Sequence, residues 1–271
     1  MVLAKELLHN GTRLKYSVRG EGTVVVLVHG FGEDGSIWEG PANLLPDHKV
    51  IIPQLPGSGG SDLLPHTTMD SLAGALQKVI VAETGGEEKV IVLGHSMGGY
   101  VTLAFAAAYP QALLGFGLVH SSAAADSEEK IETRKNGIDF IRSNGGYAFL
   151  KTMLPSLYAP ASKLEHPEWI EQQIADARRF SNEALIGYYE AMMKRPDRRD
   201  LLKTTNRPVL FLMGRHDGVV KIDDVLPQSH LPALSYIHIL EQSGHMGMIE
   251  ELEETSRVLN EFISFANGNR T

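Results

Sequence analysis

Short apolar runs rich in β-branched residues recur along the chain, and segments with helical periodicity separate them. Such runs predict buried strands at 24–28, 50–52, 90–93, 113–119, 209–213 and 236–240. Two segments of alternating polarity, 5–8 and 13–18, come first, and Asn10-Gly11 between them is a hairpin signal. Strands that alternate with helices predict an α/β fold, here a mostly parallel, doubly wound sheet with helices on both faces.

The helical segments divide into two groups. Helices predicted between the strands cover 37–45, 69–83, 97–109, 223–229 and 248–265. The alternation stops between 120 and 207, where three or four helices, including 128–144, 168–180 and 182–194, are separated by prolines. We therefore expect a core made of residues 1–121 and 208–271, with a helical cap or lid, residues 122–207, inserted after the sixth strand.

Composition argues against several classes of protein. The 271 residues are 43% hydrophobic and carry a net charge of −8, which argues against a nucleic-acid binder. The sequence contains no cysteine, so a thiolate nucleophile and Cys-type metal sites are excluded. The first residues do not resemble a secretory signal, and no apolar run approaches the roughly 18 residues of a membrane span. These features predict a cytoplasmic protein without membrane contact; its oligomeric state stays open.

Two glycine motifs suggest different chemistry. Residues 30–35 satisfy the dinucleotide-binding pattern G-x-G-x-x-G after a strand. That fold also uses an acid at the end of the next strand to hold the ribose, and residues 51–55, Ile-Ile-Pro-Gln-Leu, contain none. An NAD-dependent oxidoreductase is therefore disfavoured.

The second motif, Gly94-His95-Ser96-Met97-Gly98, matches G-x-S-x-G. It lies between a buried strand and an alanine-rich helix, so Ser96 is expected on a sharp turn at the carboxyl edge of the sheet, with a helix amino terminus beside it. A serine hydroxyl needs a base, and that base needs an orienting partner. Both partners must lie near Ser96 at the carboxyl edge of the sheet, where the loops after the last two strands also lie.

Those loops offer both partners. Asp217 follows the strand at 209–213 and His245 follows the strand at 236–240, giving the chain order Ser96, Asp217, His245. Asp126, after the sixth strand, is a rival acid. His120 and His216, the latter beside Asp217, suggest a metal site only weakly, because no matched ligand pair at helical spacing accompanies them. We expect no metal and no organic cofactor.

With these motifs in order, the chain resembles the α/β-hydrolase family over nearly its whole length. The resemblance includes His29-Gly30-Phe31-Gly32, the turn at 55–62, the serine turn, Gly214-x-x-Asp217 and Gly244-His245. It implies that the N–H groups of Phe31 and Met97 form an oxyanion hole. Gln54 and Lys221 depart from common residues at those positions, where an acid and a proline are frequent. Serine as the nucleophile argues against the dehalogenase and epoxide hydrolase branches, which use a carboxylate.

The expected activity is hydrolysis of a small acyl substrate, an ester, thioester or lactone, through an acyl-enzyme. Alternatives on the same triad are C–C bond hydrolysis, perhydrolysis and aminopeptidase action; a further alternative is a non-catalytic ligand-binding hydrolase fold. The insertion is rich in aromatic residues, which predict either its own small core or a substrate pocket. The candidate pocket residues are His29, Gly30, His95, Tyr147, Trp169, Tyr188 and Met246.

Overall fold

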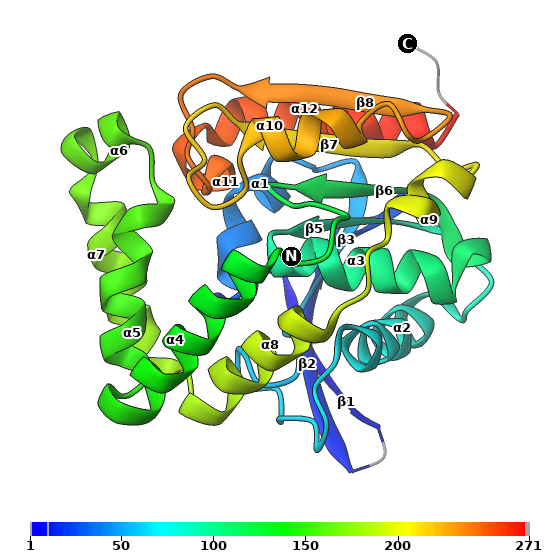
Figure 1. Ribbon diagram of the computed structural model, residues 1–271. Coiled ribbons are helices and arrows are strands. Elements are labelled where there is room, and N and C mark those ends of the chain that lie inside the picture. The colour runs from blue at the N-terminus through cyan, green and yellow to red at the C-terminus, as the bar shows by residue number, and fades with distance from the viewer. Residues whose placement is uncertain (1, 10, 269–271) are drawn as a thin grey trace.

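A computed structural model describes residues 2–9 and 11–268. It contains an eight-stranded sheet with the strand order β1-β2-β4-β3-β5-β6-β7-β8 (Figure 1). The bounds are β1 Leu3–His9, β2 Thr12–Arg19, β3 Thr23–Val28, β4 His48–Pro53, β5 Val90–His95, β6 Leu113–Val119, β7 Val209–Gly214 and β8 Ser235–Leu240. Strands β3 to β8 are parallel to one another. The predicted α/β fold with a mostly parallel sheet is confirmed.

The first two strands form an antiparallel hairpin. Strand β1 pairs with β2 in a continuous register from Leu3↔Val18 to His9↔Thr12, and β2 pairs antiparallel with β4. In the predicted turn, Asn10 lies outside the described residues, while Gly11 has φ +79°, a conformation that glycine adopts at little cost. The hairpin thus extends the parallel sheet at one edge.

Helices cover both faces of the sheet (Figure 1). Helices α2 and α3 pack together, and α3 lies against β5 and β6, whereas α1 packs on α12 and α12 on β6 and β8. The α-helices are α1 Glu39–Asn43, α2 Met69–Thr84, α3 Met97–Ala108, α4 Glu128–Asn144, α5 Gly146–Met153, α6 Pro160–Glu165, α7 Pro167–Asp176, α8 Asn182–Lys194, α9 Arg199–Thr204, α10 Ile222–Val225, α11 Gly247–Glu250 and α12 Leu252–Ala266. Within the described part of the chain, no helix has the length and apolar character needed to cross a membrane.

Helices α4 to α8 follow β6 and precede β7. Helix α4 packs against α5 and α8, and α5 packs against α7, so these helices contact one another. In Figure 1, β6 and β8 run towards the side of the molecule on which α5, α6 and α7 stand. The insertion therefore lies near the carboxyl ends of the parallel strands, where α/β proteins place their sites.

Several predicted helices have different boundaries in the structure. The segment predicted as one helix over 248–265 is broken at Glu251, whose backbone leaves the helical region (φ −132°, ψ 60°). The Glu251 carboxylate accepts hydrogen bonds from Gln242 N–H and the Ser243 hydroxyl. These contacts hold the loop that carries His245, and they explain an interruption that periodicity alone does not show. Helices α5, α6 and α9 are additional to the three inserted segments that the pattern predicts by their bounds.

Candidate active site

Ser96 occupies the turn between β5 and α3 with φ 51° and ψ −116°, outside the regions that a non-glycine residue ordinarily adopts. Backbone strain of this kind costs about 1–3 kcal/mol and persists only where surrounding contacts enforce it. Here Ser96 N–H donates to Val119 O at 2.9 Å, and Ser96 O accepts from Gly99 N–H at 2.9 Å and from the Ser121 hydroxyl at 2.7 Å. Hydrogen bonds on both sides of the residue thus maintain the strained turn.

The glycines of the motif are required by close packing. A Cβ on Gly94 would lie 2.2 Å from Gly98 O, and one on Gly98 would lie 2.4 Å from Val28 O. A Cβ on Gly99 would lie 2.2 Å from the Ser121 hydroxyl, the group that holds Ser96 O. The strand, the turn and the helix can therefore approach this closely only with glycine at all three positions.

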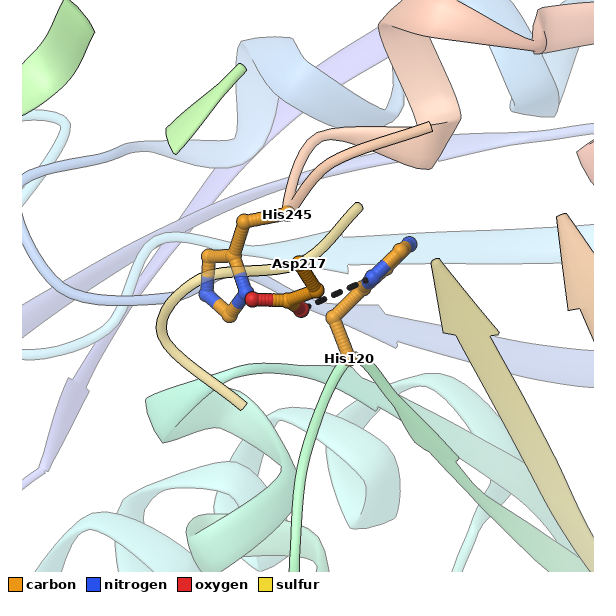
Figure 2. Close-up of side chains that lie close together, drawn as sticks. All are labelled: His120, Asp217 and His245. Atoms are coloured by element: carbon orange, nitrogen blue, oxygen red, sulfur yellow. Dashed lines mark hydrogen bonds and ion pairs between the residues drawn. The ribbon is translucent and has the colours of Figure 1, made fainter. Parts of the chain in front are cut away.

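The loops after β7 and β8 bring Asp217 and His245 together, as Figure 2 shows. His245 Nδ1–H donates to Asp217 Oδ2 at 2.7 Å. His120, at the end of β6, donates from Nδ1 to the same oxygen at 3.2 Å, while its Nε2 accepts from Gly247 N–H at 3.3 Å. Asp217 Oδ1 accepts from the N–H groups of Val219 and Val220, each at 2.8 Å. Both carboxylate oxygens of Asp217 are thus fully engaged.

These contacts fix the charges of the cluster. Burial by itself would raise the pKa of Asp217, but electrostatic attraction to His245 and the hydrogen bonds from both histidines hold it well below its usual range. Burial lowers the pKa of His120 to about 4, so this ring is neutral near pH 7. Asp217 is therefore ionised, and the bond from Nδ1 leaves His245 Nε2 as the ring atom with a free lone pair.

His120, Asp217 and His245 could also be read as a metal cluster, since one ligand atom from each lies within 4.8 Å of the others. The hydrogen bonds disfavour that interpretation. Both Nδ1 atoms carry the protons that they donate to Asp217, and His120 Nε2 already accepts from Gly247. A cation would have to displace protons from the atoms that join the three residues.

The loop carrying His245 is also fastened to the helical insertion. His245 N–H donates to Leu157 O at 2.6 Å. The Glu250 carboxylate accepts from Gly244 N–H and Met246 N–H through Oε1, and from Ala159 N–H and the Ser162 hydroxyl through Oε2. Glu250 therefore joins the two residues flanking His245 to residues 159–162 of the insertion. No motif in the sequence marks Glu250 as part of the site.

A second charged pair, Glu33 with His95, joins the glycine loop after β3 to the end of β5. His95 Nδ1 is 2.9 Å from Glu33 Oε2, and His95 Nε2 is 2.8 Å from His245 O. Glu33 Oε2 also accepts from Gly30 N–H at 2.8 Å. Burial opposes both charges, yet their mutual attraction raises the pKa of His95 and lowers that of Glu33. With two acceptors facing its two nitrogens, His95 is a buried imidazolium that links the Gly30 loop to the His245 loop.

Replacing Glu33 with glutamine is expected to lower the free energy of unfolding by about 3–5 kcal/mol, because it leaves the His95 charge buried without its partner. The contribution of Glu33 is present above its ordinary pKa of 4.5 and is lost as pH falls through its lowered pKa. That of His95 is present below 6.5 and is lost as pH rises through its raised pKa. Urea unfolding of the wild type and of Glu33→Gln should therefore show the largest difference in the free energy of unfolding between pH 4.5 and pH 6.5.

A matched control is Glu132→Gln, which removes an exposed pair with Lys135 and should change stability by less than about 1 kcal/mol. Equal stability of the Glu33→Gln variant and the wild type at pH 6 would contradict the assignment of a charged pair.

Ser96 and His245 line one cavity of about 330 Å³. Its other lining residues include Phe31 and Val220 of the sheet domain, with Met153, Leu157 and Tyr189 from the insertion. The phenyl ring of Phe31 stacks on Tyr189, with ring centres 4.2 Å apart. The cavity thus has a largely apolar wall that includes residues of both the sheet domain and the insertion.

The seven candidate pocket residues do not line this cavity. His29 is fully buried: its Nδ1–H donates to Gly30 O, and its Nε2 accepts from Leu55 N–H. These two hydrogen bonds hold the glycine loop, and burial lowers the pKa of His29. His95 and Gly30 belong to the Glu33 pair described above, and Met246 is fully buried in the core.

The three aromatic candidates have other partners. Tyr188 is buried, and its hydroxyl donates to Pro56 O at 2.7 Å, whereas the cavity is lined by its neighbour Tyr189. Trp169 stacks on the His166 ring, and the Arg178 guanidinium lies over the Tyr147 ring. None of the three rings is among the residues that line the cavity shared by Ser96 and His245. For Tyr188 the reason is helical phase, because adjacent helical positions point about 100° apart and the sequence does not show which of them faces inward.

The expected oxyanion donors lie beside the cavity. Phe31 follows Gly30 in the loop after β3, and Met97 is the first residue of α3. Among the described residues, no hydrogen bond uses the N–H of Phe31 or of Met97. Both backbone donors are therefore available to a ligand.

Asp126 has a different environment from Asp217. Its buried carboxylate receives Arg134 Nε at 2.7 Å and Arg195 Nη1 at 2.9 Å. Burial would raise its pKa, but the two guanidiniums lower it. The rival acid thus forms part of an arginine cluster, while Asp217 contacts His245.

The chain matches the model of the "Alpha/beta hydrolase family" over residues 25–258. It is 27% identical to a pimeloyl-[acyl-carrier protein] methyl ester esterase of Vibrio cholerae, covering 92% of this chain and 97% of the relative. It is also 27% identical to a 2-hydroxy-6-oxononadienedioate/2-hydroxy-6-oxononatrienedioate hydrolase of Paraburkholderia phymatum, covering 95% and 93%.

Among solved structures, a malate-bound thermophilic esterase from Thermogutta terrifontis superposes with a TM-score of 0.90 and 28% identity. The superposition covers 97% of this chain and 99% of the esterase. The match to the family model and the close superposition lead to one conclusion: the chain belongs to the alpha/beta hydrolase family of enzymes.

Proposed function

We propose that the protein hydrolyses a small acyl substrate, a carboxylic ester, thioester or lactone, with Ser96, His245 and Asp217 as its catalytic triad. The observation that carries the proposal is the 2.7 Å hydrogen bond from His245 Nδ1 to Asp217, which leaves Nε2 as the base in the cavity that Ser96 also lines. Residues 122–207 serve as a cap that supplies part of the cavity wall.

The proposed reaction follows from these positions. His245 Nε2 removes the hydroxyl proton as Ser96 Oγ attacks the carbonyl carbon, and the ionised Asp217 stabilises the imidazolium. The N–H groups of Phe31 and Met97 hold the oxyanion, and each donor in such sites contributes about 2.7–4 kcal/mol. Collapse expels the alcohol or thiol with the proton from His245, and water then attacks the acyl-enzyme by the same steps. The scheme uses no metal or organic cofactor.

Names of relatives support ester hydrolysis and keep one alternative open. The Vibrio cholerae and Thermogutta terrifontis proteins are named as esterases, whereas the Paraburkholderia phymatum relative is named for hydrolysis of a dienedioate. The identity to the two relatives is equal, at 27%. We therefore retain C–C bond hydrolysis on the same triad as the second candidate.

Covalent labelling and a substrate series test the proposal together. We expect a fluorophosphonate probe to modify the folded protein at one residue, located by peptide mass mapping at Ser96, because His245 activates this hydroxyl. Hydrolysis of p-nitrophenyl esters of graded acyl length should follow, with a preference for short chains that fit about 330 Å³.

Absence of both labelling and ester hydrolysis in folded protein would exclude the proposed function and favour a non-catalytic binding protein. Labelling at Ser96 with turnover of vinylogous diketones but not of esters would instead support the C–C hydrolase.

A further inference from the structure

The inward face of helix α4 changes character along its length. Residues Gly137, Ile138 and Ile141 are buried and continue one stripe at helical spacing. One and two turns earlier, the same stripe consists of Lys130, Thr133 and Arg134, and all three line the cavity shared by Ser96 and His245. A helix that only covers a core continues its apolar stripe. The polar turns occur where α4 covers the cavity.

Arg134 provides an unbalanced charge at this wall. Its side chain is 17% exposed, and its Nε and Nη2 donate to Asp126 at 2.7 and 3.3 Å. Asp126 also receives Arg195 Nη1, so two guanidiniums share one buried carboxylate and the cluster has a net charge of +1. Arg134 Nη1 donates to none of the residues that the structure describes.

The other acids near the cavity do not balance this charge. Glu33 lines the cavity but is paired with the His95 imidazolium. The ionised Asp217 is not among the residues that line the cavity, and its oxygens already accept hydrogen bonds from His245, His120, Val219 and Val220. Lys130 adds a second cation; its Nζ lies 4.0 Å from Asp224, and both side chains are exposed to solvent. The α4 wall of the cavity is therefore cationic.

The rest of the cavity wall is mainly apolar, and this limits the kind of ligand that the cavity can hold. Phe31, Met153, Leu157, Met192 and Val220 present apolar or thioether groups to the cavity. A ligand that satisfies both walls has a short hydrocarbon chain with an anionic group at one end. A single excess positive charge matches a carboxylate, whereas a phosphate monoester carries about −1.5 to −2 at pH 7.

We propose that Arg134 binds a carboxylate of the substrate, remote from the carbonyl that Ser96 attacks, so that the enzyme acts on half-esters of short dicarboxylic acids. This inference rests on the proposed function and deepens it. Arg134 is then a specificity-determining residue, and Asp126 with Arg195 holds its guanidinium against the cavity.

Two isosteric esters test the inference. Monomethyl glutarate ends in a carboxylate, and methyl 5-methylhexanoate places an isopropyl group in the same position. The wild type should have the higher kcat/KM for monomethyl glutarate. Arg134→Met should lower that kcat/KM by about 10- to 100-fold, mainly through KM, because a hydrogen bond to a charged group is lost. The kcat/KM for the neutral ester should change by less than about 3-fold.

The controls separate binding from folding. Arg195 still pairs with Asp126 in Arg134→Met, and Arg134→Lys should restore part of the preference. Arg142→Met makes the same change on an exposed part of α4 and should leave both esters unaffected. Wild-type enzyme that hydrolyses both esters equally, with Ser96 labelled by the probe, would overturn the inference and leave the proposed function standing. No hydrolysis and no labelling would overturn both.

Discussion

Replacement of Ser96 by alanine is expected to lower kcat for a reactive ester by about a million-fold, the loss seen when the nucleophile of a serine triad is removed. No hydrogen bond among the described residues uses the Ser96 hydroxyl, and the backbone bonds that enforce the turn do not depend on the side chain. Stability should therefore change little. Rates measured with p-nitrophenyl acetate, together with thermal unfolding of both proteins, check the two parts of this expectation.

A matched control is Ser58→Ala. Ser58 is buried, and its hydroxyl lies 2.9 Å from the Tyr188 hydroxyl; neither residue lines the cavity. Its removal should cost about 0.5–1.5 kcal/mol of stability and leave kcat nearly unchanged. If Ser96→Ala retained more than about a hundredth of the wild-type rate, catalysis would not depend on a serine nucleophile.

Local patterns made most of the sheet and the serine turn predictable. Apolar runs identify the strands of this sheet because parallel strands are buried on both faces. G-x-S-x-G could be placed on a turn because Val90–His95 precedes it as a strand and Met97–Ala108 follows as a helix. The sharp turn itself depends on close contacts such as that of Gly98 with Val28 O. These contacts require glycine, so the glycines of the motif indicate the turn in the sequence.

Other features depend on contacts between distant residues. Glu33 looks like a loop residue of the glycine pattern until His95, 62 positions later, lies 2.9 Å from it. Glu250 stands next to the break in a predicted helix, and only the folded chain shows that it holds the His245 loop. For charged residues inside a continuous pattern, the sequence gives no indication of which partner the fold supplies.

The cavity wall was the least predictable part. Tyr188 and Tyr189 are neighbours in α8, and which of them faces the cavity is determined by how α8 packs on α4. Arg134 reads as a solvated residue of a charged helix, although the stripe it shares with Ile138 and Ile141 points inward. Tertiary packing determines which side of an inserted helix faces the cavity, and a single sequence does not show that packing.

Replacement of Asp217 by asparagine is expected to lower kcat by about ten-thousand-fold, since the triad histidine then loses the partner that fixes its tautomer. The structure adds a reason specific to this site. Oδ2 accepts from His120 and His245, and Oδ1 accepts from the N–H groups of Val219 and Val220. An amide NH₂ would face two donors in either orientation.

His120 cannot relieve this conflict, because its Nε2 accepts from Gly247 N–H and its Nδ1 must therefore carry the proton. Asp217→Asn should also lose about 1–3 kcal/mol of stability from unsatisfied buried groups. The comparison variant is Asp126→Asn, which disturbs the arginine cluster but makes no contact with His245. Turnover of a neutral ester that survives in Asp217→Asn and disappears in Asp126→Asn would transfer the role of triad acid to Asp126.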